Sequence, residues 1–175
     1  MRLPCSGALR IELVQPEPSS HAPAEPKWLS SSQQRAWRAY MDGNQRLATA
    51  LNRQLQRDSD LTLAEYRILV LLSEAPDRSL RMSELADGVL SSRSRLTHQI
   101  RRLETQRMVR RNTCLEDGRG VLAELTEEGM RRLEAAAPGH VEAVRRNFID
   151  LLGPEQLDIV GEVFARVDHE IGNTD

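Results

Sequence analysis

The stretch SSRSRLTHQIRRLETQRMVRRNTCLEDGRGVLAELTEEG, residues 91–129, decides the fold of this 175-residue chain. In its first part, Leu96, Ile100 and Leu103 recur at helical spacing and share one face. Its second part holds two short runs rich in strand-forming residues, 109–115 and 120–125, around a Glu-Asp-Gly-Arg-Gly turn. The stretch therefore predicts a helix over about 92–106 that is followed by a β-hairpin.

Basic charge is concentrated in the same stretch. Residues 91–120 contain eight arginines against three acidic residues, a local net charge of +5 in a chain whose formal net charge is −2. Such asymmetry is typical of proteins that bind nucleic acid, even when the whole chain is acidic. A helix with a basic outer face, backed by a basic hairpin, indicates a protein that binds duplex DNA.

Two capping boxes predict helix starts upstream of this stretch. Ser30 with Gln33, and Thr62 with Glu65, have the spacing at which paired side chains satisfy the first free amides of a helix. A short helix over 83–88 then precedes the 92–106 helix after a step of three residues. Two helices joined by so short a turn are typical of a helix-turn-helix.

Apolar stripes at helical spacing continue from Thr126 almost to the C-terminus. Pro138 is expected to kink the first of these helices rather than end it, because the stripe keeps its phase beyond the proline. Pro154 is expected to open the second helix, since proline is favoured at the first helical position. The two stripes are Met130, Leu133, Ala137, Val141, Val144, Phe148 and Leu151, then Leu157, Val160, Phe164, Val167 and Ile171.

Three further features of the sequence limit the class of protein to which the chain can belong, namely its first 29 residues, its cysteines and its apolar runs. Residues 1–29 contain five prolines among polar residues and are expected to form a disordered tail. Cys5 and Cys114 give neither a disulfide framework nor a metal-binding spacing. Because no apolar run is long enough to span a membrane and the N-terminus lacks a signal-type core, we expect a soluble, cytoplasmic protein.

Five short motifs lie in a fixed order along the chain. They are Ser83-Glu84-Leu85-Ala86, Leu96-Thr97 with Leu103-Glu104, Val109-Arg110-Arg111, Asp117-Gly118-Arg119 and Leu125-Thr126-Glu127-Glu128-Gly129. In this order and spacing they resemble the MarR (multiple antibiotic resistance regulator) family of winged helix-turn-helix transcription factors. One departure is Arg107, where members of the family often have the glycine that ends the recognition helix.

The resemblance implies a mainly α fold with a small β-wing. A winged helix-turn-helix domain at 61–126 would be flanked by an N-terminal dimerisation helix at 30–60 and by C-terminal dimerisation helices at 127–175. It also implies a homodimer that binds double-stranded DNA at a pseudo-palindromic operator, acts as a repressor and is released by a small-molecule effector. The long apolar stripes at both chain ends independently favour a dimer, since a monomer of this size has little core left to cover them.

The expected DNA-binding residues follow from the geometry of the two elements. The recognition helix fits the major groove, where outward side chains meet base edges and phosphates. In the family, the arginine equivalent to Arg119 enters the minor groove from the wing tip, braced by the aspartate two residues earlier. The predicted set is Ser83, Ser92, Arg93, Ser94, Arg95, Thr97, His98, Arg101, Arg102, Arg111, Asp117 and Arg119.

For two pairs of residues, the serines that begin the two short helices and the arginines of the first strand, the sequence leaves two roles open. Ser83 and Ser92 begin the two short helices, so they either contact phosphates or simply cap the helices, and the two roles can coexist. Arg110 and Arg111 alternate across a strand, so only one of them is expected to face DNA.

The resemblance further implies a crevice between the dimerisation helices and the winged domain for an aromatic or phenolic effector. The candidates are Trp37, Tyr40, Tyr66 and Arg67, although such aromatic residues more often belong to a core. We expect no cofactor and no metal, because His140, Asp168, His169 and Glu170 lack the tight spacing of metal ligands. Cys114 lies on the wing without a second thiol nearby in sequence, which argues against redox sensing.

Two other classes of function compete with the DNA-binding regulator. A winged-helix module that only binds proteins would make the arginines of the helix and the wing dispensable. An enzyme is not supported by the sequence, which shows no nucleophile–base set, no phosphate-binding loop and no set of metal ligands.

Overall fold

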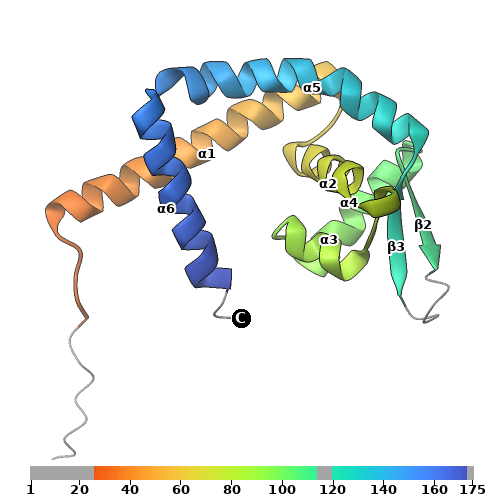
Figure 1. Cartoon of the computed structure of the whole chain (residues 1–175), viewed down its shortest axis with the longest axis horizontal. Helices are drawn as coiled ribbons and strands as arrows, with labels where there is room; N and C mark the ends of the chain where they lie inside the picture. Colours follow the sequence, from red (N-terminus) through yellow and green to blue (C-terminus); the bar gives the residue numbers. More distant parts are fainter. Residues whose placement is uncertain (1–25, 114–119, 173–175) are drawn as a thin grey trace, which may run out of the picture.

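The computed structural model describes residues 26–113 and 120–172. Most of the predicted tail, as well as Cys114, Asp117 and Arg119, lies outside the described residues. The fold is mainly helical with a small antiparallel sheet, which confirms the predicted fold class. The elements are α1 Ser31–Ser59, α2 Leu63–Glu74, η1 Pro76–Arg78, β1 Ser79–Arg81, α3 Met82–Gly88, α4 Arg93–Thr105, β2 Val109–Thr113, β3 Val121–Leu125, α5 Glu127–Asn147, η2 Ile149–Leu151 and α6 Pro154–Gly172 (Figure 1).

Both predicted capping boxes form. The Gln33 amide donates to Ser30 Oγ over 3.3 Å, and the Ser30 amide donates to Gln33 Oε1 over 2.8 Å. At the start of α2, the Glu65 amide donates to Thr62 Oγ1 over 3.2 Å, and the Thr62 amide donates to Glu65 Oε2 over 2.8 Å. These reciprocal hydrogen bonds satisfy backbone amides that the start of a helix leaves without a partner. They also fix the residues at which α1 and α2 begin.

The hydrophobic core lies in the winged domain, on the right of Figure 1, where α2, α3 and α4 pack against the sheet. Leu96, Ile100 and Leu103 are fully buried, as their helical spacing predicts. The C-terminal part of α1 and the first half of α5 close this core from the other side. The other residues buried in it are Leu55, Leu61, Ile68, Leu69, Leu72, Leu85, Ala86, Met108, Val109, Ala123, Leu125, Leu133 and Ala136.

The sheet has three strands in the order β1-β3-β2, all antiparallel. The β2–β3 hairpin was expected from the sequence, but β1 was not. This strand has only three residues, all half-buried, so it shows no alternation of apolar and polar side chains. Its pairing with β3 places Leu80 opposite Ala123 and brings the start of α3 next to the wing.

The structure corrects the predicted start of the helix over 83–88. This helix, α3, begins at Met82 after Arg81, so Ser83 lies within its first turn and does not cap it. The extended β1 ends at Arg81 and therefore sets the helix start one residue earlier than the predicted range. Ser92 does cap α4, because its Oγ accepts a hydrogen bond from the Arg95 amide over 3.3 Å.

Helix α5 continues through Pro138, as predicted, but its buried face differs from the predicted stripe. The buried residues are Gly129, Leu133, Ala136 and Ala143, whereas Val141 is exposed. Helix α5 lies along α1 (Figure 1), and the alanines of its buried face suit such a close approach of two helices. Gly129 instead lies against the Met108 carbonyl. The predicted stripe is therefore correct at Leu133 and wrong at Val141, which is turned outwards.

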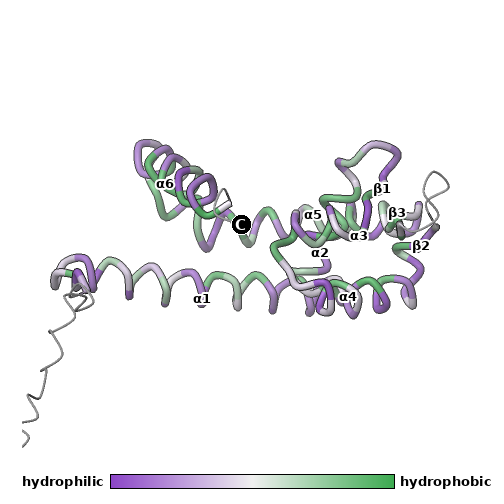
Figure 2. Tube along the Cα trace, turned by 90° about the horizontal axis from the view of Figure 1, so that it is seen from below, coloured by the Kyte–Doolittle hydropathy of each residue, from purple (hydrophilic) through white to green (hydrophobic). Residues whose placement is uncertain are grey.

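An arm built from the N-terminal part of α1, the end of α5 and α6 projects away from the winged domain (Figure 1). No residue of α6 is buried in the chain, although apolar residues recur along it in Figure 2. Trp37 and Tyr40 of α1 form a ring cluster with Phe164 of α6, with ring centroids 5.7 and 5.5 Å apart. The arm thus presents a largely uncovered apolar surface.

Candidate nucleic-acid interface

A tight turn fixes the orientation of α4 relative to α3. The Val89 amide donates to the Leu85 carbonyl and the Ser91 amide donates to the Ala86 carbonyl, each over 3.0 Å. Leu90 adopts a left-handed conformation, with φ at 51°, and closes the turn. Because α3 is anchored by buried Leu85, the turn holds α4 against the core as in a helix-turn-helix.

The outer face of α4 is exposed and basic. Ser94, Arg95, His98 and Arg101 all lie on the solvent side. Within residues 26–113 and 120–172, the guanidinium groups of Arg93, Arg95 and Arg101 make no hydrogen bond or ion pair. These cations are therefore available to an anionic ligand, whereas most other arginines of the domain are already paired.

Thr97 and Ser92 are engaged in the helix itself. Thr97 Oγ1 donates to the Arg93 carbonyl over 2.8 Å, and Ser92 Oγ serves as the helix cap. Their predicted DNA contacts stay predictions, and the structure adds a local role for each hydroxyl.

Arg102 differs from the other arginines of α4 because it contacts the junction between α1 and α2. Its guanidinium donates to Glu65 Oε2 over 3.3 Å and to both the carbonyl and the Oδ1 of Asp60 over 3.1 Å. Glu65 is only 2% exposed, so this contact compensates a buried carboxylate. The structure therefore gives Arg102 an intramolecular role that the sequence pattern did not predict, and its DNA contact stays a prediction.

Acidic partners hold both basic residues of β2. Arg110 Nε donates to Glu124 Oε2 over 2.9 Å, and Asn112 Nδ2 donates to the same oxygen over 2.6 Å. The hydrogen bond from Arg110 lowers the pKa of Glu124 below its ordinary value. Arg111 instead pairs with Glu104 of α4 over 2.6 Å, which ties the wing to the recognition helix.

The structure does not bring the four effector candidates together. Trp37 and Tyr40 lie on the arm, whereas Tyr66 packs against His140, with ring centroids 4.4 Å apart. Burial raises the pKa of Tyr66 and lowers that of His140. Arg67 Nη2 donates to the Gly88 carbonyl over 3.0 Å and is the one candidate of the four that lines a cleft between α1 and the winged domain.

That cleft has a volume of about 610 Å³ and is lined by residues that the sequence pattern did not select. Arg53, Ser91, Arg95 and Gln99 contribute to its wall. In the described part of the chain, the buried Ser91 Oγ and Gln99 Oε1 have no hydrogen-bond partner. Isolated polar residues of this kind carry no periodic signal, so only the packed structure reveals them.

The described residues offer neither a metal site nor a membrane-spanning helix. Among them, no group of three or more histidine, cysteine, aspartate or glutamate side chains could hold a metal ion. No helix in these ranges has the length and apolar character needed to cross a membrane.

The fold and the exposed basic helix beside a hairpin define a winged helix-turn-helix protein. The sequence model of the MarR family matches residues 59–120. The Streptomyces coelicolor MarR family regulator Sco3205, solved in complex with DNA, is 45% identical, with a TM-score of 0.81 over 84% of this chain and 92% of that one. AbsC, a MarR family regulator of the same organism, is 41% identical, with a TM-score of 0.80 over 85% and 99%.

A curated relative agrees with these structures. The HTH-type transcriptional repressor YetL of Bacillus subtilis is 33% identical over 110 residues, which are 61% of this chain and 66% of that protein. The chain belongs to the MarR family of transcriptional regulators, and it is a DNA-binding regulator of the winged-helix type.

Proposed function

We propose that this regulator acts as a homodimeric repressor on a pseudo-palindromic operator, with α4 of each protomer in the major groove. The observation that carries the proposal is the exposed outer face of α4. In the described part of the chain, its Arg93, Arg95 and Arg101 have no intramolecular partner. Such cations bind phosphates by releasing counterions, and arginine can also pair with guanine through two hydrogen bonds.

The uncovered arm supports the dimeric part of the proposal. Phe164, Val167 and Ile171 of α6 are 43%, 44% and 64% exposed, and Trp37 of α1 is 54% exposed. Contiguous apolar surface of this kind on a small protein marks an interface. A second copy of the arm would bury it symmetrically and would space two recognition helices about one DNA turn apart, roughly 34–36 Å.

The cleft between α1 and the winged domain supports an effector. Arg53, Arg67 and Arg95 provide positive charge there, and the buried Gln99 Oε1 and Ser91 Oγ provide unused polar groups within the described residues. An aromatic or phenolic anion suits this lining. Since Arg95 and Gln99 belong to α4, a ligand bound here would favour one dimer geometry over another and release DNA. The proposed activity is binding without catalysis, in the cytoplasm.

The test is a footprint of the purified protein on the DNA upstream of its own gene, combined with transcription in vitro from that promoter. The proposal predicts protection of two half-sites about one helical turn apart and reduced transcription on binding. Scrambling one half-site should lower the affinity much more than scrambling the spacer. Protection of a single half-site by a monomer, or unchanged transcription from an occupied site, would contradict the homodimeric repressor.

The competing function is a winged-helix module that binds only proteins. It predicts that charge reversal at Arg95 and Arg101 leaves the activity in cells unchanged. A reporter assay with Arg95→Glu and Arg101→Glu therefore separates the two functions.

A further inference from the structure

Arg101 and Arg102 are neighbours on α4 but have different surroundings. Successive residues of a helix point about 100° apart, and Arg102 is the one directed at the junction of α1 and α2. It donates to Glu65 and Asp60, whereas the guanidinium of Arg101 makes no hydrogen bond or ion pair within the described residues. Gln106, the residue that follows α4, donates to the second carboxylate oxygen of Asp60 over 3.0 Å. We call these contacts, from Arg102 and Gln106 to Asp60 and Glu65, the α4 anchor.

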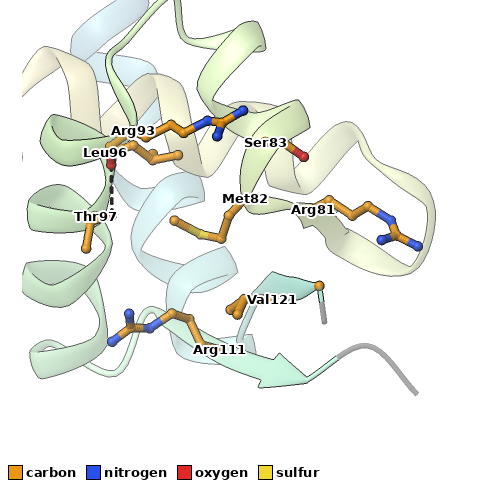
Figure 3. Close-up of a pocket in the computed structure, with 9 residues that line it drawn as sticks. Arg81, Met82, Ser83, Arg93, Leu96, Thr97, Arg111 and Val121 are labelled. Carbon is orange, nitrogen blue, oxygen red and sulfur yellow. Dashed lines mark hydrogen bonds between the residues drawn. The ribbon is translucent and has the colours of Figure 1, made fainter. Parts of the chain in front are cut away.

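A second contact holds the opposite flank of the same half of α4. Arg111 reaches from β2 towards the helix (Figure 3) and pairs with Glu104 over 2.6 Å. Arg102 and Glu104 are two residues apart, about 200° around the helix, so one contact ties α4 to the end of α1 and the other ties it to the wing. The exposed stripe between them includes His98 and Arg101. The helix is thus held on both sides of the face proposed to read DNA.

The charge of Arg102 is already balanced inside the protein. Glu65 is 2% exposed, and its Oε2 accepts from Arg102 as well as from the amide and the hydroxyl of Thr62. If the guanidinium moved to a DNA phosphate, the buried carboxylate would lose its cation, which is unfavourable. These contacts therefore favour a role for Arg102 in holding α4 over a contact with DNA.

We propose that Arg102 is a positioning residue which, together with Asp60 and Gln106, sets the angle of α4 in the major groove and thereby the discrimination between DNA sequences. This inference rests on the proposed placement of α4 in that groove. A bidentate hydrogen bond to a base edge forms only over a narrow range of distance and angle. Phosphate contacts depend mainly on charge and carry no sequence information. Loss of the α4 anchor therefore lowers discrimination more than it lowers affinity for DNA in general.

The test measures the affinity of the full-length protein for the upstream DNA and for scrambled DNA, and takes the ratio of the two as the discrimination. Arg102→Ala removes a positive charge from the α4 anchor, Asp60→Gly removes a negative charge, and Gln106→Ala removes none. Glycine suits the left-handed conformation of Asp60, with φ at 53°. All three variants should lower the ratio by roughly five- to tenfold, which is within what one bidentate base contact supplies. The salt slope on scrambled DNA should change by much less than about 0.9, the value for one phosphate contact.

Two controls separate positioning from stability and from charge. The double variant Arg102→Ala with Glu65→Gln should recover most of the free energy of unfolding but not the ratio, because the contact from α4 to Asp60 is still absent. Arg131→Ala is the matched control, since Arg131 also pairs with an acidic residue, Glu128, but on its own helix α5. It should change neither the ratio nor the salt slope.

Three results would overturn the inference. The first is an unchanged ratio in all three variants. The second is Arg102→Ala weakening binding to both DNAs by the same factor with a salt slope lower by about 0.9, which would make Arg102 a phosphate contact. The third is recovery of the ratio in the double variant, which would reduce the α4 anchor to a contribution to stability. If the wild-type protein binds no duplex, the placement of α4 fails first and this inference fails with it, whereas a wild-type protein that discriminates and is weakened by Arg101→Ala retains that placement whatever the anchor variants show.

Discussion

Arg107 ends the recognition helix in a conformation that glycine adopts more easily. Its φ is 60°, and its amide donates to the Glu104 carbonyl over 2.9 Å, so the left-handed closure expected for this position is present with an arginine. A side chain with a Cβ is strained there. Replacement by glycine should therefore relieve strain without moving the helix.

Arg107→Gly should raise the free energy of unfolding by about 0.5–1 kcal/mol, the relieved strain less the added freedom of the unfolded chain. Thermal and urea unfolding monitored by circular dichroism provide the measurement. Arg107→Ala is the control, since alanine removes the charge but keeps the Cβ. Equal stabilisation by both substitutions would attribute the gain to charge and contradict the strain.

Gly129 lies at a close approach between α5 and Met108, the residue that precedes β2. A Cβ added at this position would lie 2.1 Å from the Met108 carbonyl oxygen. Gly129→Ala should therefore lower the free energy of unfolding by about 1–3 kcal/mol through overpacking. Gly43→Ala, where an added Cβ meets nothing within 4 Å, should be neutral or slightly stabilising in the same denaturation experiment. A neutral Gly129→Ala would show that the contact is looser than the structure indicates.

For single residues, the sequence predicts whether a side chain is buried better than it predicts which other side chain it contacts. Leu96, Ile100 and Leu103 could be assigned to the core because periodicity alone identifies a buried helix face. Arg102 could not be separated from Arg101 in the same way. Its carboxylate partner Glu65 lies 37 residues away in sequence, and only the folded chain brings the two together.

Among the elements, the junction of α1 and α2 is the point at which the C-terminal end of α1 contacts the recognition helix. Asp60 ends α1 in a left-handed conformation, with φ at 53°. It accepts hydrogen bonds from Arg102 and from Gln106 Nε2, the latter over 3.0 Å. These hydrogen bonds tie the C-terminal end of α1 to α4.

Arg102→Ala should lower the free energy of unfolding by about 1–3 kcal/mol, because it leaves the buried Glu65 carboxylate without its cation. Glu65→Gln should remove most of that penalty when combined with Arg102→Ala. A double-mutant cycle in urea measures the coupling, which should be at least about 0.5 kcal/mol. If the two substitutions changed the free energy of unfolding additively, the interaction between Arg102 and Glu65 would contribute nothing to stability.

The sequence predicts long elements more reliably than short ones. The capping boxes and apolar stripes identify α1, α2, α4, α5 and α6, since each spans several turns. The three-residue β1 has no pattern of its own and exists because β3 offers it an edge. The apolar stripe predicted for α5 is correct at Leu133 but misses Ala136 and Ala143, because small side chains give a weak periodic signal.

For the whole molecule, the uncovered apolar surface lies on the arm and the exposed basic helix lies on the winged domain. The arm leaves Phe164, Val167 and Trp37 uncovered, while the winged domain has a closed core of its own. We expect the arm to be covered by a second protomer.

Phe164→Glu should shift the protein from dimer to monomer, because it introduces a charge into the apolar surface of α6. Sedimentation velocity measures the change, with Glu162→Ala on the same helix as the control. The monomeric variant should also lose most of its operator affinity, since two half-sites must be held together. An unchanged dimer would place the interface elsewhere on the chain.

The most direct test of α4 as the DNA-reading helix is the salt dependence of DNA binding, measured by fluorescence anisotropy with the DNA upstream of the gene and with scrambled DNA. Wild-type protein, Arg101→Ala and Arg146→Ala would be compared, since Arg101 and Arg146 are both exposed arginines but lie on α4 and α5. We predict steep salt dependence, preference for the upstream DNA, and a loss of about 1–3 kcal/mol in binding free energy for Arg101→Ala alone. Equal binding by all three proteins, or no binding to any duplex at low salt, would contradict the assignment of α4 as the DNA-reading helix.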